Sequence, residues 1–334
     1  MIFLAADVGG TNTRLILADY SGAHRTTLYE KKYPSEQYYD FYEIVALFLK
    51  ESNITAPLDA ACIAVAGPVK NAEASVTNLP WNITEKALKK ILQTQKVKLI
   101  NDFAAVSYGV SELKGDEVEI IQQGKPAFES NPSAVIIGAG TGLGVSHRVW
   151  IHDRYHVLTS EAGHTAFAPQ DKLQTRLLNY MQKESAYVSL ENVLSGRGFQ
   201  HIYHFLQHEL SLDESAEIKH LFEQQDPAQV ITQAAMLKKD ELCEKTVELF
   251  ISIYGAAAGN AALYYYPVDE VYIAGGIAPK INLSLNSETF VSALTTKGLM
   301  SENMQILSVK LINQDAVGLS GALIYARSLF NDER

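Results

Sequence analysis

Cysteine is scarce in this sequence: only Cys62 and Cys243 occur among its 334 residues. Cys62 lies in the apolar segment 60–66, so we expect two buried thiols rather than a disulfide. Apolar runs are short as well, and none approaches the roughly 20 residues of a membrane span. The N-terminus lacks a basic stretch and reaches Asp7 after a few apolar residues, too few for a signal peptide. We therefore expect a cytoplasmic protein without a membrane partner.

Positive charge is not in excess anywhere. The formal net charge is −10 and no Lys/Arg cluster offsets it, which argues against a nucleic-acid partner. No Gly-x-x-x-x-Gly-Lys-Ser/Thr sequence occurs, which excludes a P-loop. The glycine-rich segment 138–144 has Leu143 at the third glycine position of Gly-x-Gly-x-x-Gly, and a strand is expected after it. A dinucleotide-binding motif is therefore excluded too.

The composition that is present is ordinary for a globular protein, with 47% hydrophobic and 20% charged residues in a chain long enough for two domains. The first third alternates strand and helix patterns. We expect strands at 2–6, 15–18, 60–66 and 97–100, and helices around 36–51 and after an N-cap at Thr84. A second set of strands begins near residue 135, and the longest helix is expected over 240–266. This alternation predicts α/β domains with ligands at the strand ends.

The most informative segment is Asp7-Val8-Gly9-Gly10-Thr11-Asn12-Thr13-Arg14, which lies between two apolar strands. Paired glycines let the backbone approach a ligand closely, and successive N–H groups form an anion-binding concavity. An acid at the strand end suits a hydrated divalent cation. The segment favours a clamp for nucleotide phosphates built on a hairpin. The structural alternative is a glycine hairpin with a chance Asp.

Two further glycine elements also follow apolar strands. The segment 138–144 separates the strand patterns 135–137 and 145–150, so a strand–glycine turn–strand element occurs twice in the chain. The third element, with Gly275 and Gly276, follows the strand pattern 271–273 and is expected to open a helix.

Five further strings accompany the glycine elements: Ala66-Gly67-Pro68-Val69, Thr77-Asn78-Leu79-Pro80-Trp81, Asn101-Asp102-Phe103, Glu161-Ala162-Gly163-His164-Thr165 and Leu190-Glu191-Asn192-Val193-Leu194-Ser195-Gly196. From Asp7 to about Ala326 the chain resembles the bacterial-type glucokinases, outside the ROK group, of the sugar kinase, heat-shock protein 70 and actin superfamily. ROK kinases carry a Cys-rich zinc motif, which two scattered cysteines cannot make.

This resemblance implies an α/β protein with the actin-like ATPase (ribonuclease H-like) fold, two α/β domains with a cleft between them. The small domain would cover residues 1–110 and be joined by a C-terminal helix at about 316–334, and the large domain would cover 111–315. The three glycine elements would be the first phosphate, second phosphate and adenosine motifs. ATP would then be held by Ala6, Asp7, Val8, Gly9, Gly10, Thr11, Asn12, Gly138, Gly140, Thr141, Gly275 and Gly276. Asp7 would hold Mg²⁺ through a metal-bound water.

Asn101 and Asp102 follow the apolar strand pattern 97–100, and ligands bind at the carboxyl ends of such strands. Phosphoryl transfer to an alcohol needs a carboxylate near the hydroxyl that loses its proton, a role that Asp102 fits. The resemblance assigns Asp102 the same role, as base for the 6-hydroxyl of a sugar, with Asn101 also binding the sugar. A helix N-cap is the structural alternative, and both can hold at once.

Glu161 and His164 stand three residues apart, and this Glu-x-x-His order invites a metal-site interpretation, but no second close ligand set accompanies it. A carboxylate accepts two sugar hydroxyls at once, and an imidazole adds one donor and one acceptor. By resemblance, Glu161, His164 and Glu191 bind the hydroxyls near the anomeric carbon. The alternatives are a surface turn for Glu161 and a helix cap for Glu191. His201, His204 and His208 share one helix face, which we interpret as partly exposed rather than metal-binding.

Taken together with these residues, the resemblance implies a glucokinase, an ATP-dependent enzyme that phosphorylates the 6-hydroxyl of glucose. A kinase for another hexose, such as mannose or an N-acetylhexosamine, is the enzymatic alternative. A sugar-sensing regulator would carry a DNA-binding helix-turn-helix before the clamp, for which residues 1–6 offer no room. Pyrophosphate or polyphosphate would need the same glycine elements as ATP. Relatives of this size commonly pair, so a homodimer is expected.

Overall fold

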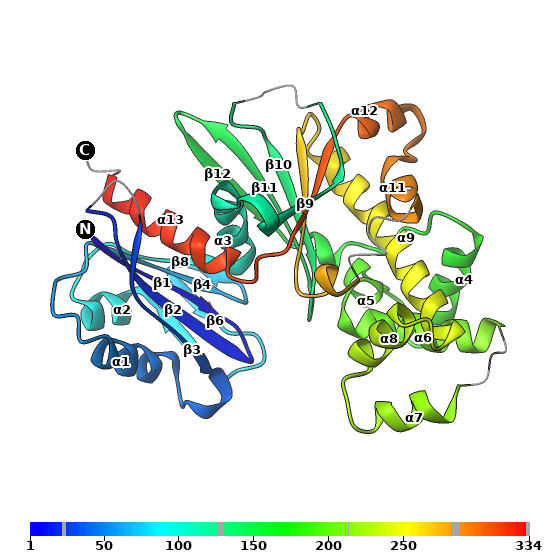
Figure 1. Ribbon diagram of the computed structural model, residues 1–334, viewed down its shortest axis with the longest axis horizontal. Helices are drawn as coiled ribbons and strands as arrows, with labels where there is room; N and C mark the ends of the chain where they lie inside the picture. Colours follow the sequence, from blue (N-terminus) through cyan, green and yellow to red (C-terminus); the bar gives the residue numbers. More distant parts are fainter. Residues whose placement is uncertain (22–24, 126–129, 211, 213, 282–287, 332–334) are drawn as a thin grey trace. The chain divides into compact units, whose positions relative to one another are not determined.

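The computed structural model describes residues 1–21, 25–125, 130–210, 212, 214–281 and 288–331. The chain forms two compact units, each built around its own sheet (Figure 1). Unit 1 comprises Met1–Lys114, Val157–Thr159 and Gln314–Arg334, and unit 2 comprises Gly115–His156 and Ser160–Asn313.

The main sheet of unit 1 has the strand order β3-β2-β1-β4-β8. Its strands are β1 (Ile2–Val8), β2 (Asn12–Asp19), β3 (Thr26–Pro34), β4 (Ala60–Val65) and β8 (Val97–Asn101). The helices of this unit are α1 (Phe41–Ser52), α2 (Glu85–Leu92), α3 (Asp102–Gly109) and α13 (Val317–Asn331). A small antiparallel sheet comprises β5 (Val69–Lys70), β6 (Glu73–Ser75) and β7 (Asn82–Thr84). Strands β1, β4 and β8 run parallel, so their carboxyl ends lie at one edge of the sheet.

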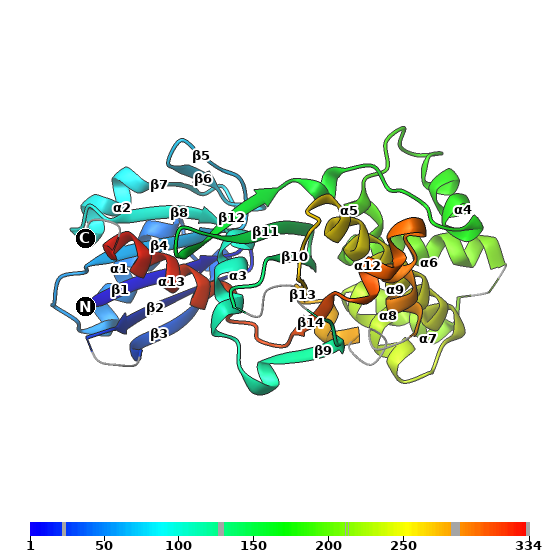
Figure 2. The ribbon, with the colours of Figure 1, turned by 90° about the horizontal axis from the view of Figure 1, so that it is seen from above.

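Alternation along β1 creates two apolar layers. Leu4 and Ala6 belong to a core with residues of α1 and α2, whereas Phe3 and Ala5 belong to a core with residues of α3 and α13. Successive strand residues point to opposite faces, so the sheet is covered on both sides. Figures 1 and 2 both show α3 and α13 side by side against the strands.

Helices α3 and α13 are packed backbone to backbone. A Cβ atom at Gly321 would collide with the carbonyl of Ala105, and one at Gly109 would collide with the carbonyl of Val317. Glycine at both positions therefore permits a closer approach than any other residue would allow. The helix at the end of the chain is thereby fixed to the helix that follows β8.

Unit 2 has a six-stranded sheet with the order β12-β11-β10-β13-β14-β9. The strands are β9 (Val118–Gln122), β10 (Ala134–Ala139), β11 (Leu143–Ile151), β12 (Arg154–Ser160), β13 (Glu270–Ala274) and β14 (Ser308–Ile312). The helices are α4 (Lys172–Met181), α5 (Leu190–Val193), α6 (Gly196–Leu210), α7 (Ala216–Phe222), α8 (Pro227–Met236), α9 (Glu241–Tyr264), α11 (Glu288–Thr295) and α12 (Ser301–Gln305). Strand residues Val135, Ile137 and Ile273 share one core with residues of α6, α8 and α9.

Helix α9 is the one described helix that is long and apolar enough to cross a membrane, but 78% of its most apolar window is buried within the protein. It therefore has the character of a core helix. Cys62 and Cys243 are both buried and free, as expected from the sequence.

Several predicted elements differ in extent from those observed. The helix expected over 36–51 begins at Phe41, because Ser35–Gln37 form a 3-10 turn and Asp40 caps α1 by accepting the N–H of Glu43. The glycines at 275–276 lead into the short 3-10 helix Ala278–Ile281. Further 3-10 helices are Val110–Glu112, Gly115–Glu117, Ala162–His164 and Gly298–Met300. The last helix ends at Asn331, and residues 332–334 of the expected span lie outside the described residues.

Candidate active site

The first glycine element is the turn of the β1–β2 hairpin, which pairs in register from Ile2↔Asp19 to Val8↔Thr13. The N–H of Gly9 donates to the carbonyl of Asn12 at 2.9 Å. Ser35 braces the turn from outside, because its N–H donates to Thr11 O at 2.9 Å and its hydroxyl to Gly9 O at 2.8 Å. The side chains of Thr11 and Asn12 are exposed at the tip. These hydrogen bonds within the protein fix the shape of the turn.

The candidate nucleotide residues of the hairpin divide into two kinds. Ala6 and Val8 have fully buried side chains, so only their backbone atoms are available to a ligand. Gly10 lies against the loop between β6 and β7, since a Cβ atom there would lie 3.0 Å from Thr77 O. A larger side chain at this position would have to enter the space in front of the hairpin.

Asp7 is positioned at the end of β1 beside helix α13. A Cβ atom on Gly318 would lie 3.4 Å from Asp7 Oδ2, so glycine keeps this carboxylate face clear. Burial raises the pKa of Asp7, and the positive charge of Arg14 opposes that rise. A carboxylate oxygen is a hard donor of the kind that Mg²⁺ prefers. The residues present therefore fit a magnesium ion carried by a nucleotide.

Asp102 begins α3 directly after β8, at the same sheet edge as Asp7. The N-cap is Asn101, whose side-chain oxygen accepts the N–H of Phe103 at 2.9 Å. Asn101 Nδ2 donates to Asp102 Oδ1 at 2.8 Å and to Gly67 O at 3.3 Å. Asp102 Oδ1 also accepts the N–H of Phe103 at 2.9 Å. The helix-cap interpretation of this pair is thus correct, and the cap fixes the Asp102 carboxylate as well.

The pKa of Asp102 is raised to about 6. Burial contributes most and the nearby charge of Asp7 adds to it, while hydrogen bonds from backbone N–H groups and from Asn101 oppose the rise. A carboxyl group that titrates near neutral pH is suited to accept a proton.

The second glycine element links β10 to β11 in unit 2. Gly140 N–H donates to Gly142 O at 2.8 Å, which makes a tight turn whose Thr141 side chain is exposed. Gly138 is buried within β10, between Gly144 and Ala274. The third element lies next to this turn, because a Cβ atom on Gly275 would collide with the carbonyl of Ala139. Gly275 also has φ +85°, so glycine is required there on both counts.

The candidate sugar residues of unit 2 come from two segments that pair with each other. Phe167 N–H donates to Val188 O at 2.9 Å and Leu190 N–H donates to Thr165 O at 2.8 Å. The Tyr187 hydroxyl donates to His164 O at 2.6 Å. These contacts place the 3-10 helix 162–164 and helix α5 side by side.

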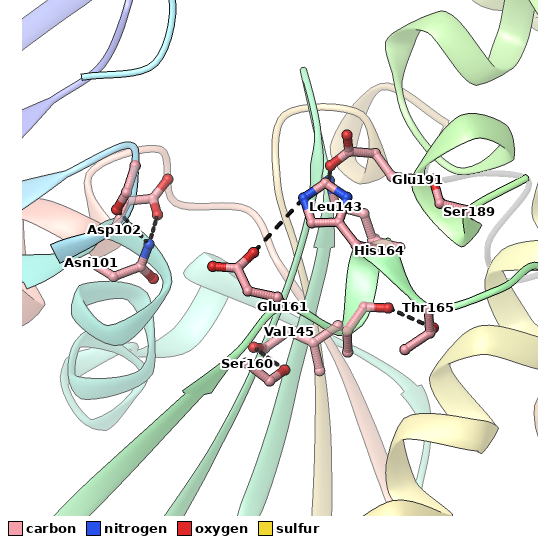
Figure 3. Close-up of polar contacts among 12 residues, drawn as sticks. Asn101, Asp102, Leu143, Val145, Ser160, Glu161, His164, Thr165, Ser189 and Glu191 are labelled. Atoms are coloured by element: carbon pink, nitrogen blue, oxygen red, sulfur yellow. Dashed lines mark hydrogen bonds and ion pairs between the residues drawn. The ribbon is translucent and has the colours of Figure 1, made fainter. Parts of the chain in front are cut away.

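Figure 3 shows Glu161 and His164 directed toward one another, with Glu191 on the main chain of Leu143. His164 Nε2 lies 3.9 Å from Glu161 Oε2, and the two side chains are 63% and 80% exposed. Glu191 is half-buried, and its Oε2 accepts the N–H of Leu143 at 2.9 Å. Three polar groups are thus presented on one unit, each with hydrogen-bonding capacity left for a polyhydroxyl ligand.

The histidines of α6 do not form a common site. His201 Nδ1 lies 2.7 Å from Asn192 O, while His204 and His208 are exposed. Within the described ranges, no group of three or more His, Cys, Asp or Glu is arranged to hold a metal ion.

The candidate residues of unit 1 and those of unit 2 form two half-sites. Several residues that shape these half-sites were not expected from the sequence. Ser35 lies 26 positions after Gly9 in the sequence, and Tyr187 lies 23 positions after His164. No local pattern links such pairs. Ser189 and Asn192 did carry a signal, because they form a capping box at the start of α5 and so orient Glu191.

The fold is that of sugar kinases with the actin-like ATPase fold. A structure of a ROK family glucokinase from Streptomyces griseus, in complex with glucose and AMPPNP, shares this fold with a TM-score of 0.62 at 16% identity, covering 98% of this chain and 100% of that one. A glucokinase structure from an Antarctic psychrotroph has a TM-score of 0.85 at 31% identity, covering 98% and 99%.

The sequence matches the Glucokinase family over residues 4–329. It is 40% identical to a glucokinase of Nostoc punctiforme, covering 98% of this chain and 99% of the relative. The chain belongs to the glucokinase family. The family and the fold expected from the sequence are thereby confirmed.

Proposed function

We propose that this protein is a glucokinase that transfers the γ-phosphoryl group of ATP to the 6-hydroxyl of glucose, giving glucose 6-phosphate and ADP. The observation that carries the chemistry is the Asn101–Asp102 pair: a carboxyl group with a pKa of about 6, fixed at the start of α3. The assignment of glucose and ATP as the substrates rests on membership of the glucokinase family.

Asp102 acts as the base. Its Oδ1 is already engaged by Asn101 and by the N–H of Phe103, so we assign Oδ2 to the sugar 6-hydroxyl. Removing that proton makes the oxygen a stronger nucleophile toward the γ-phosphorus. Asn101 positions the carboxylate and contributes to sugar binding.

Glu161, His164 and Glu191 bind the sugar at the hydroxyls near the anomeric carbon. Two carboxylates supply acceptors for several hydroxyl protons, and the imidazole supplies a donor and an acceptor. The site thereby recognises hydroxyl groups by their direction, which orients the 6-hydroxyl for transfer.

Backbone N–H groups of the hairpin and of the β10–β11 turn cradle the phosphates, together with the Thr11 and Thr141 hydroxyls. Gly275 and Gly276 are exposed and lack side chains, so the adenosine is able to lie against their backbone. Magnesium bound to the nucleotide would neutralise phosphate charge, and Asp7 would hold it through water. The overall acidity of the chain makes such local positive potential necessary.

We propose further that unit 1 and unit 2 are the small and large domains of the enzyme. The domain boundary is near residue 110, and the chain re-enters the small domain after residue 315. Phosphoryl transfer requires both half-sites to act on one sugar, so closure around glucose and ATP is expected to exclude water as a competing acceptor. A cytoplasmic homodimer is proposed from the resemblance, and light scattering of the purified protein tests the oligomeric state.

One coupled assay of ADP release tests the proposal. Glucose, mannose, 2-deoxyglucose and N-acetylglucosamine are compared as acceptors with Mg·ATP, and polyphosphate and pyrophosphate are compared as donors by glucose 6-phosphate formation. Glucose with ATP should give the highest kcat/KM. A higher kcat/KM for N-acetylglucosamine would overturn the sugar assignment, and activity that survives complete chelation of Mg²⁺ would overturn the role of the metal.

A further inference from the structure

Glu191 is held at the start of α5 by a well-defined cap. Ser189 caps the helix by accepting the N–H of Asn192, and the side chain of Asn192 accepts the N–H of Ser189 in return. His201 Nδ1 lies 2.7 Å from Asn192 O and supports the same turn. The cap fixes the Glu191 backbone and so limits the reach of its carboxylate.

That carboxylate contacts the glycine turn of the second phosphate element. Leu143 N–H donates to Glu191 Oε2 at 2.9 Å (Figure 3). A hydrogen bond to an ionised acceptor is stronger than one between neutral groups. It also leaves Oε1 as the oxygen available to a ligand.

The Glu191 carboxylate occupies the space that a side chain at position 142 would need. A Cβ atom on Gly142 would lie 2.6 Å from Glu191 Oε2 and 3.3 Å from its carboxyl carbon. Gly140, two residues earlier in the same turn, is different, since a Cβ atom there would meet nothing within 4 Å. Neither glycine has a positive φ, so alanine is conformationally allowed at both positions. The two glycines form a matched pair in which only one touches Glu191.

A second contact ties the same two segments. Gly196 N–H, just after α5, donates to Gly140 O at 2.8 Å. The turn 140–143 is therefore bound to the segment 191–196 at both of its ends, once by a side chain and once by the backbone.

We propose that Glu191 divides its carboxylate between the two substrates, Oε1 to the sugar and Oε2 to the phosphate-binding turn, so that glucose binding strengthens nucleotide binding through this residue. Gly142 is then a positioning residue that keeps the carboxylate on the turn. The proposal rests on the proposed function. Because coupling between two ligands is reciprocal, bound nucleotide strengthens glucose binding by the same factor.

The first experiment measures glucose affinity without nucleotide, by calorimetry, in the wild type, Gly142→Ala and Gly140→Ala. Displacing the carboxylate from Leu143 removes a charge-assisted hydrogen bond, and we expect about tenfold weaker glucose binding in Gly142→Ala. Gly140→Ala should bind glucose within about twofold of the wild type, because its added methyl group touches nothing. Equal glucose affinity in Gly142→Ala and Gly140→Ala would overturn the proposal.

A double-mutant cycle separates positioning from a general structural effect. If Gly142 acts only through Glu191, the glucose affinity of Glu191→Ala should not fall further when Gly142→Ala is added. Losses that multiply in the double variant contradict the proposal. Glu191→Ala also keeps the test decisive if Gly142→Ala does not fold, because removing the carboxylate must by itself abolish the coupling measured next.

The coupling is measured as the affinity for Mg·AMPPNP with and without saturating glucose. In the wild type, glucose should tighten binding at least about fivefold, the low end of allosteric coupling. In Glu191→Ala and Gly142→Ala the enhancement should disappear. A wild type that phosphorylates glucose but shows no enhancement refutes the coupling alone, whereas a wild type that does not phosphorylate glucose refutes the proposed function.

Discussion

The two half-sites differ in how far they are closed off from water. In unit 1, Asp7 and Asp102 lie among packed strand and helix ends, and burial raises the pKa of both carboxyl groups. In unit 2, the Glu161 and His164 side chains are 80% and 63% exposed. The carboxyl group proposed for the chemistry is therefore fixed by its hydrogen bonds, whereas the side chains proposed for sugar recognition are open to solvent.

This difference means that the two halves should respond differently to substitution. A half-buried carboxylate with fixed partners has no nearby replacement, so its loss should cause the largest fall in turnover. Each exposed side chain that binds the sugar should contribute less to the binding free energy, because it exchanges hydrogen bonds with water for hydrogen bonds with the substrate. The predictions below test this contrast, from the largest expected effect to the smallest.

Asp102→Asn should lower kcat by about 10²–10⁴-fold, the usual contribution of a general base. Glucose binding should change far less, because the amide still forms hydrogen bonds. Turnover and glucose titration by intrinsic fluorescence are measured on the same preparation. Near-normal turnover in this variant removes Asp102 from the catalytic role.

Gly10→Val should weaken ATP binding by up to about 100-fold, because the branched side chain meets Thr77 O on one side and is forced toward the phosphates on the other. Glucose binding to the folded variant should persist. Calorimetry with each ligand, together with a thermal melt, decides the matter. Wild-type ATP affinity would mean that the hairpin has only a structural role.

The pH dependence of kcat/KM for glucose should report Asp102. The base must be ionised, so the rate should fall by about tenfold per pH unit below pH 6, where the carboxyl group becomes protonated. Asp7 interacts with Asp102, so the observed value belongs to the pair. A rate that stays constant down to pH 4.5 would contradict the assignment.

The same raised pKa affects stability with a defined sign. The folded pKa of Asp102 lies above its ordinary value of 3.8, so the folded state binds more protons and loses stability as the pH rises through about 6. Asp102→Asn should therefore be more stable than the wild type at pH 7 by roughly 1–3 kcal/mol, and the difference should vanish at pH 4. Urea unfolding of both proteins at the two pH values measures this difference in the free energy of unfolding.

His164→Ala should reduce the preference for glucose over 2-deoxyglucose. A group built to bind a hydroxyl discriminates against the deoxy sugar by about 1–3 kcal/mol when it is left unpaired. Removing the imidazole removes the penalty, so the ratio of the two kcat/KM values should fall toward one. An unchanged ratio would show that His164 does not contact the 2-hydroxyl.

Tyr187→Phe should produce the smallest effect, a two- to fivefold increase in KM for glucose, because it removes one neutral hydrogen bond to His164 O. kcat should stay unchanged, because the Tyr187 hydroxyl binds the main chain of a proposed sugar-binding residue rather than the proposed base. Tyr39→Phe, at an 89% exposed tyrosine, serves as the matched control. A fall in kcat without a change in KM would break the contrast between the two half-sites.

The local parts of this architecture could be predicted from the sequence. The hairpin at Gly9–Gly10 and the N-cap at Thr84 follow from turn and capping chemistry, which acts over a few residues. The helix expected from residue 36 was misplaced by five residues, because Asp40 provides a better cap than the positions before it. The two-domain arrangement and the actin-like fold were expected only from the resemblance to the glucokinase family.

The connections between distant segments could not be predicted in this way. The Glu191–Leu143 bond spans 48 residues and depends on a carboxylate meeting a backbone N–H, a group that every non-proline residue has. The raised pKa of Asp102 depends on Asp7, 95 positions earlier in the sequence, and on how tightly the surroundings pack. Such properties arise only when the chain is folded.

The packing of α13 on α3 has a consequence for biosynthesis. The helix that starts at Asp102 completes its packing only when Val317–Asn331 lies against it, and that segment begins 215 positions after Asp102 in the sequence. A nascent chain that already contains Asp102 and all three glycine elements therefore still lacks the support that fixes its base. We therefore expect a chain that ends before Val317 to phosphorylate sugar far more slowly than one that contains α13.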